Sequence, residues 1–200
     1  MKKIILLFFV TLFISFNVFA HPYPYSLALP PLAPPPVDIP IQNIPQETDV
    51  WCWAAVAQQI IAAKKGIHIT PNQCSLVAIS NGAPPAHCCM NYELCKIPGS
   101  ITQIQNLLLY FGGSFSGLAP PADPMTLYHT LAMGKPVIMS IKSHYSTIGH
   151  VIVIRGMGFV QTPMGIVPML HVNDPMNRFT QAIPFNQLAP MWQAAIVVHT

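Results

Sequence analysis

The stretch QETDVWCWAAVAQQIIAAKK, residues 46–65, places one cysteine between two tryptophans at the start of a helical pattern. Alanine and aliphatic residues recur over residues 51–65 with the spacing of a buried helix, and Gly66 follows as a stop. Cys52 is thus expected at a helix N-terminus, where unpaired N–H groups and the helix dipole favour thiolate over thiol. Gln46, six residues upstream, carries an amide that can donate to an oxyanion. The stretch therefore predicts a helix that begins with a nucleophilic cysteine.

Capping residues predict further helices in the first part of the chain, and β-branched runs predict strands in the last part. The helices, with their caps, are expected at 71–80 (Thr70-Pro71), 101–111 (a capping box from Ser100) and 124–134 (Asp123-Pro124). The cysteine-rich residues after Ser80 are expected to form an irregular loop. Strands are expected at 136–142, 150–159, 166–173 and 194–199. Helices first and strands afterwards predict an α+β domain with a segregated antiparallel sheet.

The N-terminal end has two segments that we place outside this domain. Residues 1–20 combine Lys2 and Lys3, an apolar run and a small-residue exit, which is typical of a signal peptide. Residues 21–45 are rich in proline and predict an extended arm, either a spacer or a pro-segment. The folded domain is then expected over residues 46–200, in a protein exported to the periplasm or secreted from a bacterium.

Composition narrows the classes of partner. Without the two lysines of the signal, seven basic residues face six acidic ones, and no basic stripe remains. Nucleic acid is therefore an unsuitable partner, and we expect no stable membrane insertion after signal removal. We expect a monomer that acts on a protein or peptide substrate.

The chain has five cysteines, and an oxidising compartment converts paired cysteines to disulfides. Cys74, Cys88, Cys89 and Cys95 lie within 22 residues, whereas Cys52 stands apart. A direct bond between the two adjacent cysteines would be strained, so each of them is expected to pair with one of the outer two. Cys52 is left over as the free thiol.

The same four cysteines with His87 also suggest a zinc site as an alternative. Adjacent cysteines seldom both bind one tetrahedral ion, and export favours oxidation. We therefore expect disulfides, with no metal and no cofactor.

A thiolate nucleophile needs a base, and imidazole is the usual one. Of the eight histidines, His150 begins the apolar strand HVIVIRG directly after Gly149, where a polar side chain faces a cleft more naturally than a core. The others are expected in the arm, in loops, in a helix, at the C-terminus or at structural positions of the strand region: His21, His68, His87, His129, His144, His171 and His199.

The base needs an acceptor that orients its ring. Asp174 ends the strand MLHVND, and a hairpin between that strand and the His150 strand would bring the two residues together. Asn173 is the alternative, but strand alternation lets only one of the two point at His150. We favour Asp174.

A glutamine, a cysteine followed by tryptophan at a helix start, a strand histidine and then an Asp resemble the papain-like cysteine proteases. The WCWAA form is most similar to the bacterial avirulence-type proteases, known as secreted effectors of plant pathogens. The resemblance implies that Cys52 is the nucleophile, His150 the base, Asp174 the orienting residue and Gln46 the oxyanion donor. It covers the chain from about Gln46 to the C-terminus.

The chain also departs from that pattern. Plant and lysosomal members carry a CGSCW-type signature, whereas Asp49-Val50-Trp51 precedes Cys52 here, and His150 follows only 98 residues later. Trp51 and Trp53 are expected to pack, with one of them forming a wall of the cleft. Two alternatives to a peptidase remain: a thiol-dependent amidase or isopeptidase acting on cell wall or conjugates, and an inert, disulfide-stapled binding module.

Overall fold

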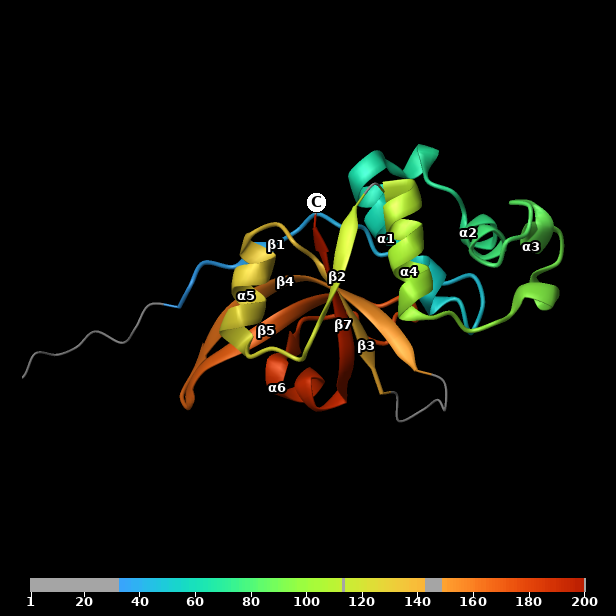
Figure 1. The fold of residues 1–200 in the computed structure, drawn as a ribbon. Helices are drawn as coiled ribbons and strands as arrows, with labels where there is room; N and C mark the ends of the chain where they lie inside the picture. Colours follow the sequence, from blue (N-terminus) through green and yellow to red (C-terminus); the bar gives the residue numbers. More distant parts are fainter. Residues whose placement is uncertain (1–32, 113, 143–148, 200) are drawn as a thin grey trace, which may run out of the picture. The chain divides into compact units, whose positions relative to one another are not determined.

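The computed structural model describes residues 33–112, 114–142 and 149–199. Its helices are α1 (Cys52–Lys65), α2 (Gln73–Ser80), α3 (His87–Met90), α4 (Ile101–Leu107), α5 (Pro124–Ala132) and α6 (Phe185–Leu188). Its strands are β1 (Val37–Asp38), β2 (Phe115–Ala119), β3 (Val137–Ile141), β4 (His150–Thr162), β5 (Gly165–Asn173), β6 (Ile183–Pro184) and β7 (Trp192–His199) (Figure 1).

The strands form one antiparallel sheet. Its order is β2-β7-β3-β4-β5-β6, and β1 pairs with β4 beyond the end of β3. The β4–β5 hairpin turns between Thr162 and Gly165, so both strands are longer than the sequence indicated. The predicted α+β class with an antiparallel sheet is confirmed, although β1 and β2 come from the part of the chain that we expected to be helical or extended.

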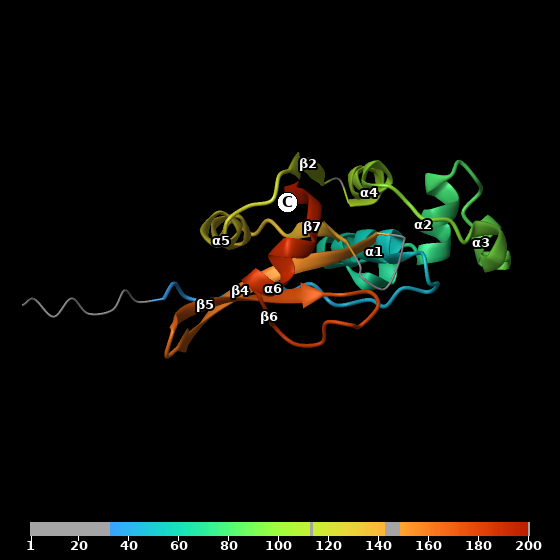
Figure 2. The same ribbon diagram turned by 90° about the horizontal axis from the view of Figure 1, so that it is seen from below.

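Each face of the sheet is covered by a separate apolar core. Alternate residues along β4 point to opposite faces: Val151 and Val153 pack with α1, α2 and α4, whereas Ile152 and Ile154 pack with α5 and α6. Figures 1 and 2 show α5 beside the sheet at one end and α1, α2 and α4 grouped at the other. The site described below lies where the first group of helices meets the start of β4.

Helix α1 begins at Cys52, one residue after the predicted start because Trp51 is its N-cap, and it ends at Lys65 as predicted. All its residues from Cys52 to Ile61 are buried, because small alanines let the helix pack closely on its neighbours. Lys64 and Lys65 lie in the last turn, where positive charge is favourable, and Gly66 ends the helix with φ +97°.

Two of the three predicted caps are confirmed. Ser100 forms a capping box with Gln103, and Asp123 accepts from the first turn of α5. α2 instead begins at Gln73, because the Asn72 side chain accepts a hydrogen bond from the backbone N–H of Ser75 and caps the helix there. α4 is also shorter than expected, since its end, Leu108–Gly112, is a π-helical turn.

The end of the proline-rich arm belongs to the fold, contrary to our expectation for residues 21–45. Val37 and Asp38 pair with β4, the N–H of Ile39 donates to the carbonyl of Arg155, and Ile41 is buried in the core. A Cβ on Gly156 would overlap the carbonyl of Val37, so glycine permits this close approach. The predicted boundary at residue 46 therefore falls inside the sheet-bearing unit.

The predicted signal peptide, residues 1–20, lies outside the described residues. Among the helices of the described part, none has the length and apolar character to cross a membrane.

The cysteine-rich segment is stapled by two disulfides, Cys74–Cys89 and Cys88–Cys95. This confirms that each of the adjacent cysteines pairs with one of the outer two, so these sulfurs are not available as thiolate ligands for zinc. The segment is more regular than an irregular loop, because it contains α3 and a 3₁₀ turn at Tyr92–Cys95.

Candidate active site

Cys52 is the free cysteine and the first residue of α1. Its exposed fraction is 8%, so the residue is nearly covered while remaining part of a cleft surface. The first turn contains no acidic residue, and no side chain caps its N–H groups. The helix dipole therefore acts on the sulfur without a competing negative charge in that turn.

His150 lies at the start of β4, paired with Ile141 of β3, and its exposed fraction is 3%. Its Nε2 lies 2.6 Å from Oδ1 of Asp174. The ring also hydrogen-bonds the Cys52 side chain, for which Nδ1 is the remaining nitrogen. The structure thus brings the predicted nucleophile, base and orienting residue into one chain of contacts.

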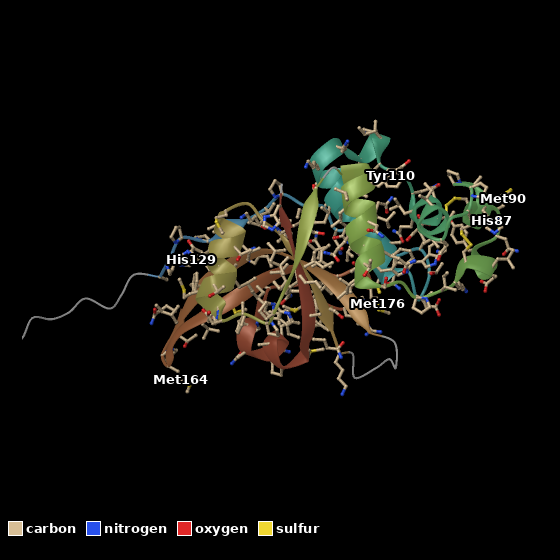
Figure 3. The ribbon with its side chains drawn as sticks, viewed as in Figure 1. His87, Met90, Tyr110, His129, Met164 and Met176 are labelled. Atoms are coloured by element: carbon tan, nitrogen blue, oxygen red, sulfur yellow. A yellow bond between two sulfur atoms is a disulfide. The ribbon has the colours of Figure 1, made fainter. Side chains whose placement is uncertain are left out.

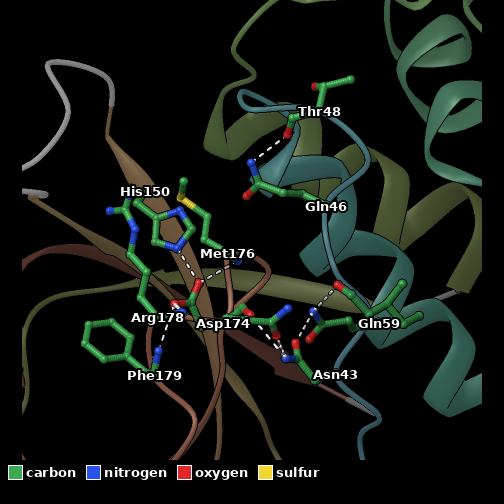
Figure 4. A network of polar contacts seen from close by, with 11 residues as sticks. Asn43, Gln46, Thr48, Gln59, His150, Asp174, Met176, Arg178 and Phe179 are labelled. Atoms are coloured by element: carbon green, nitrogen blue, oxygen red, sulfur yellow. Dashed lines mark hydrogen bonds and ion pairs between the residues drawn. The ribbon is translucent and has the colours of Figure 1, made fainter.

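Asp174 is fully buried just after β5, and its carboxylate is held by the backbone (Figure 4). Oδ1 accepts from the N–H of Met176 at 2.9 Å, and Oδ2 accepts from those of Arg178 and Phe179 at 2.8 and 3.2 Å. These bonds fix the carboxylate in front of His150. Asn173, the alternative, instead accepts from Arg155 and donates to the carbonyl of Ile41.

The electrostatics of this pair follow from its burial and its hydrogen bonds. Burial lowers the pKa of His150, but hydrogen bonds to Asp174 and Cys52, with the charges of both partners, raise the pKa to about 9. Burial raises the pKa of Asp174, whereas the bonds from His150 and from the backbone outweigh it and keep the pKa below its usual value. A charged imidazole ring beside Cys52 is therefore favoured at neutral pH.

Gln46 lies in the loop before α1 and is half-buried. Its Nε2 donates one N–H to the carbonyl of Thr48 at 2.6 Å, which leaves the second amide N–H. Its Oε1 is buried without a hydrogen-bond partner in the described part of the chain. Gln46 is absent from the residues that line the cleft around Cys52, so its predicted role as oxyanion donor stays a prediction.

The two tryptophans beside Cys52 have different surroundings. Trp51 is fully buried, donates from Nε1 to the carbonyl of Cys95 at 2.9 Å and packs its ring against Tyr92. It anchors the start of α1 to the disulfide-stapled segment. Trp53 lines the cleft, and its indole faces Gly99 so closely that a Cβ there would overlap the ring.

The cleft beside Cys52 has a volume of about 240 Å³. Its helical side is formed by the start of α1 and the residues leading into α4, and its strand side by β3 and the start of β4. The lining residues are Val50, Cys52, Trp53, Pro98, Gly99, Ser100, Ile101, Ile104, Ser140, Gly149 and Val151. Sequence reasoning missed Gly99, although a glycine directly before a capping box is a signal of close backbone approach.

The other described histidines lie away from this cleft. Figure 3 shows His87 on α3 and His129 on α5 at opposite sides of the molecule, each apart from Met176 beside the site. His171 lies 3.6 Å from Asp38, and the remaining described ones, His68 and His199, are exposed. His21 and His144 lie outside the described residues.

Comparison with known proteins gives a family and a fold. The model of the Peptidase C39-like family matches residues 38–196. A solved structure described as a C39-like peptidase from Bacillus anthracis superposes with a TM-score of 0.54 at 11% identity, covering 82% of this chain and 98% of that one. The ragweed pollen allergen Amb a 11, a cysteine protease solved in its proform, gives 0.51 at 14% identity, covering 88% and 67%. No curated protein matches the chain.

Proposed function

Since the chain belongs to the Peptidase C39-like family, we propose that it hydrolyses peptide bonds through Cys52, with His150 as base and Asp174 as orienting residue. The observation that carries this proposal is the buried contact series from the Cys52 thiol through the imidazole to the carboxylate, with 2.6 Å between His150 and Asp174. A nucleophile, a base within reach and a group that orients the base are the parts that thiol hydrolysis needs.

The proposed mechanism uses each group once in each half-reaction. The Cys52 thiolate attacks the scissile carbonyl carbon, and the Cys52 N–H with the second N–H of Gln46 stabilises the oxyanion. His150 gives its proton to the leaving amine, which departs and leaves an acyl-enzyme thioester. His150 then takes a proton from water, whose oxygen attacks the thioester, and keeps that proton as the acid product leaves, which restores the Cys52 thiolate and the protonated imidazole.

Two features support an exported enzyme. The paired cysteines indicate an oxidising compartment, and residues 1–20 have the pattern of a signal peptide. We propose a monomer released into the periplasm or outside the cell. That the chain belongs with the avirulence-type proteases, on the basis of its WCWAA motif, stays a prediction.

The test is peptide-library cleavage by the wild-type protein and by Cys52→Ala, each with intact disulfides. Loss of the nucleophile should lower kcat/KM at least roughly a thousandfold. His150→Ala should fall similarly, whereas the exposed His129→Ala serves as the matched control and should cleave as the wild type does. Cleavage by Cys52→Ala at the wild-type rate would overturn the proposal.

The same chemistry cuts other amides, so purified cell wall and isopeptide-linked conjugates belong in the substrate panel. Cleavage of those substrates alone would identify an amidase or isopeptidase. An inert module would show no cleavage, and its Cys52 would react with iodoacetamide no faster than a model thiol at the same pH.

A further inference from the structure

Residues 41–47, here called the joining segment, run between the helices and the loop that carries Asp174 (Figure 4). On the loop side, Asn173 donates to the carbonyl of Ile41 at 2.9 Å, and the N–H of Gln46 donates to the carbonyl of Pro175 at 3.0 Å. On the helix side, Gln73 donates to the carbonyl of Pro45 at 2.8 Å. The segment is therefore fastened to both sides of the site.

Asn43 lies at the centre of this arrangement and uses both ends of its amide. Its Nδ2 donates to the carbonyl of Asp174 at 3.1 Å and to Oδ1 of Asn177 at 3.0 Å. Its Oδ1 accepts from Nε2 of Gln59 at 3.1 Å. That amide nitrogen also donates to the carbonyl of Ile44 at 3.0 Å, so Gln59 holds the segment at two points.

Gln59 is a residue of α1, seven positions after Cys52, and its exposed fraction is 1%. Seven residues are almost two full turns, so both side chains project from one face of the helix, about 10 Å apart along its axis. Along that face, Cys52 reaches Asp174 through His150, and Gln59 reaches the backbone of Asp174 through Asn43. Two bridges thus join α1 to the same residue.

We propose that Asn43 is a positioning residue that, through Gln59 and the backbone of Asp174, sets the separation between the Cys52 thiol and the imidazole of His150. The inference rests on the proposed function, because it concerns how the same site is held. The Asn43 side chain bonds Gln59 of α1 with its oxygen and the carbonyl of Asp174 with its nitrogen, so it connects the helix to the loop. A fixed second bridge prevents α1 from sliding relative to the loop, which would lengthen the first one.

Asn43→Asp tests the bridge with almost no change in shape. A carboxylate still accepts from Gln59 but cannot donate to the carbonyl of Asp174 or to Oδ1 of Asn177. The matched control is Asn81→Asp, which carries the same charge change and likewise removes a donor to a backbone carbonyl, that of Val77 at 2.7 Å, away from the site. Both variants are made in the full chain with its disulfides.

The decisive measurement is the rate of Cys52 alkylation by iodoacetamide from pH 4 to 10, which needs no substrate. In Asn43→Asp we expect the rate at pH 6 to fall roughly tenfold, because the imidazole of His150 is no longer held at its native distance from the sulfur. With a cleaved peptide, kcat should fall roughly 10- to 100-fold with little change in KM, since misplacement affects the reacting groups. Asn81→Asp should match the wild type in both assays.

Gln59→Met provides a second, independent break, because it removes the donor on the helix side and keeps the side-chain length. Combining it with Asn43→Asp should lower the alkylation rate no further than the worse single variant, as expected for two parts of one bridge. Gln59→Met alone also tests the bridge if Asn43→Asp fails to fold.

An unchanged pH profile of alkylation in folded Asn43→Asp or in Gln59→Met would overturn the inference, even where the melting temperature falls. Additive losses in the double variant would also contradict it. Absence of peptide cleavage by the wild type would overturn the proposed peptidase function alone, because the alkylation profile still reports the geometry of Cys52 and His150.

Discussion

Replacing Asp174 by Asn keeps the shape of the side chain and exchanges one acceptor oxygen for an NH2 group. In the native site Oδ2 accepts from the N–H groups of Arg178 and Phe179, and Oδ1 accepts from that of Met176 and faces Nε2 of His150. An NH2 at the Oδ2 position would face two backbone donors. At the Oδ1 position it would face one, and it could donate to a neutral His150.

The second orientation is therefore favoured, and its cost can be worked from these bonds. One buried N–H loses its acceptor, which costs about 1–3 kcal/mol, and the bonds that remain lose the carboxylate charge, which costs about 1 kcal/mol more. We expect Asp174→Asn to lower the free energy of unfolding at pH 7 by about 2–4 kcal/mol. An NH2 that donates to Nε2 also moves the imidazole proton of His150 to Nδ1, the nitrogen on the side of Cys52.

Urea unfolding followed by circular dichroism measures the free energy of unfolding, and NMR titration of the imidazole measures the protonation of His150. The pKa of His150, raised to about 9 in the wild type, should fall in Asp174→Asn, because burial remains while a hydrogen bond and a charge are lost. Asp123→Asn is the matched control: Asp123 caps α5 at the surface, and Asn caps a helix equally well.

A stability within about 0.5 kcal/mol of the wild type, together with an unshifted His150 titration, would refute this reasoning. It would mean that the backbone donors of the loop do not depend on the carboxylate. A loss of the same size in Asp123→Asn would show that the charge change alone is responsible.

Two further predictions concern pH and the first strand. The pKa of His150 is about 9 in the folded protein and near 6.5 in the unfolded chain, so its contribution to the stability of the fold is complete below pH 6.5 and is lost as the pH rises through 9. Urea unfolding should therefore show a free energy of unfolding about 3 kcal/mol lower at pH 9.5 than at pH 6. A free energy of unfolding that does not change with pH would contradict this prediction. Gly156→Ala should lower the free energy of unfolding by about 1–3 kcal/mol and speed proteolysis around Val37, since the new Cβ displaces β1. Gly117→Ala should change neither, because its Cβ would meet only Nε2 of His199, at an ordinary contact distance of 3.9 Å. Unchanged protection of β1 in Gly156→Ala would contradict this prediction.

Features encoded by neighbouring residues could be predicted from the sequence. The alanine spacing and Gly66 define α1, and the capping residues Ser100 and Asp123 locate two more helix starts. The contact between His150 and Asp174 could also be anticipated, because a hairpin brings its two open ends together by local geometry alone.

Features that depend on distant residues could not be predicted. β1 has only two residues and no alternation of its own, and its place is set by Gly156, far along the chain. Asn43 and Gln59 belong to no recognisable sequence motif, because their contacts depend on Asp174, which lies 131 residues after Asn43. α2 also starts later than expected, since Asn72 offers a better cap than Thr70, which instead bonds the carbonyl of Gly66.

The fastening of β1 and the joining segment has a consequence for the order in which the protein assembles. Asp38 pairs with Arg155 across 117 positions, and Asn43 bonds Asp174 across 131. The first residues of the domain to be synthesised therefore cannot form these contacts until residues near its end have been synthesised. Closing such long loops comes late in folding, after local helices and the hairpin have formed. A partly synthesised chain therefore contains Cys52 without His150 and Asp174, and the proposed nucleophile gains its base and orienting residue only after most of the domain has been made.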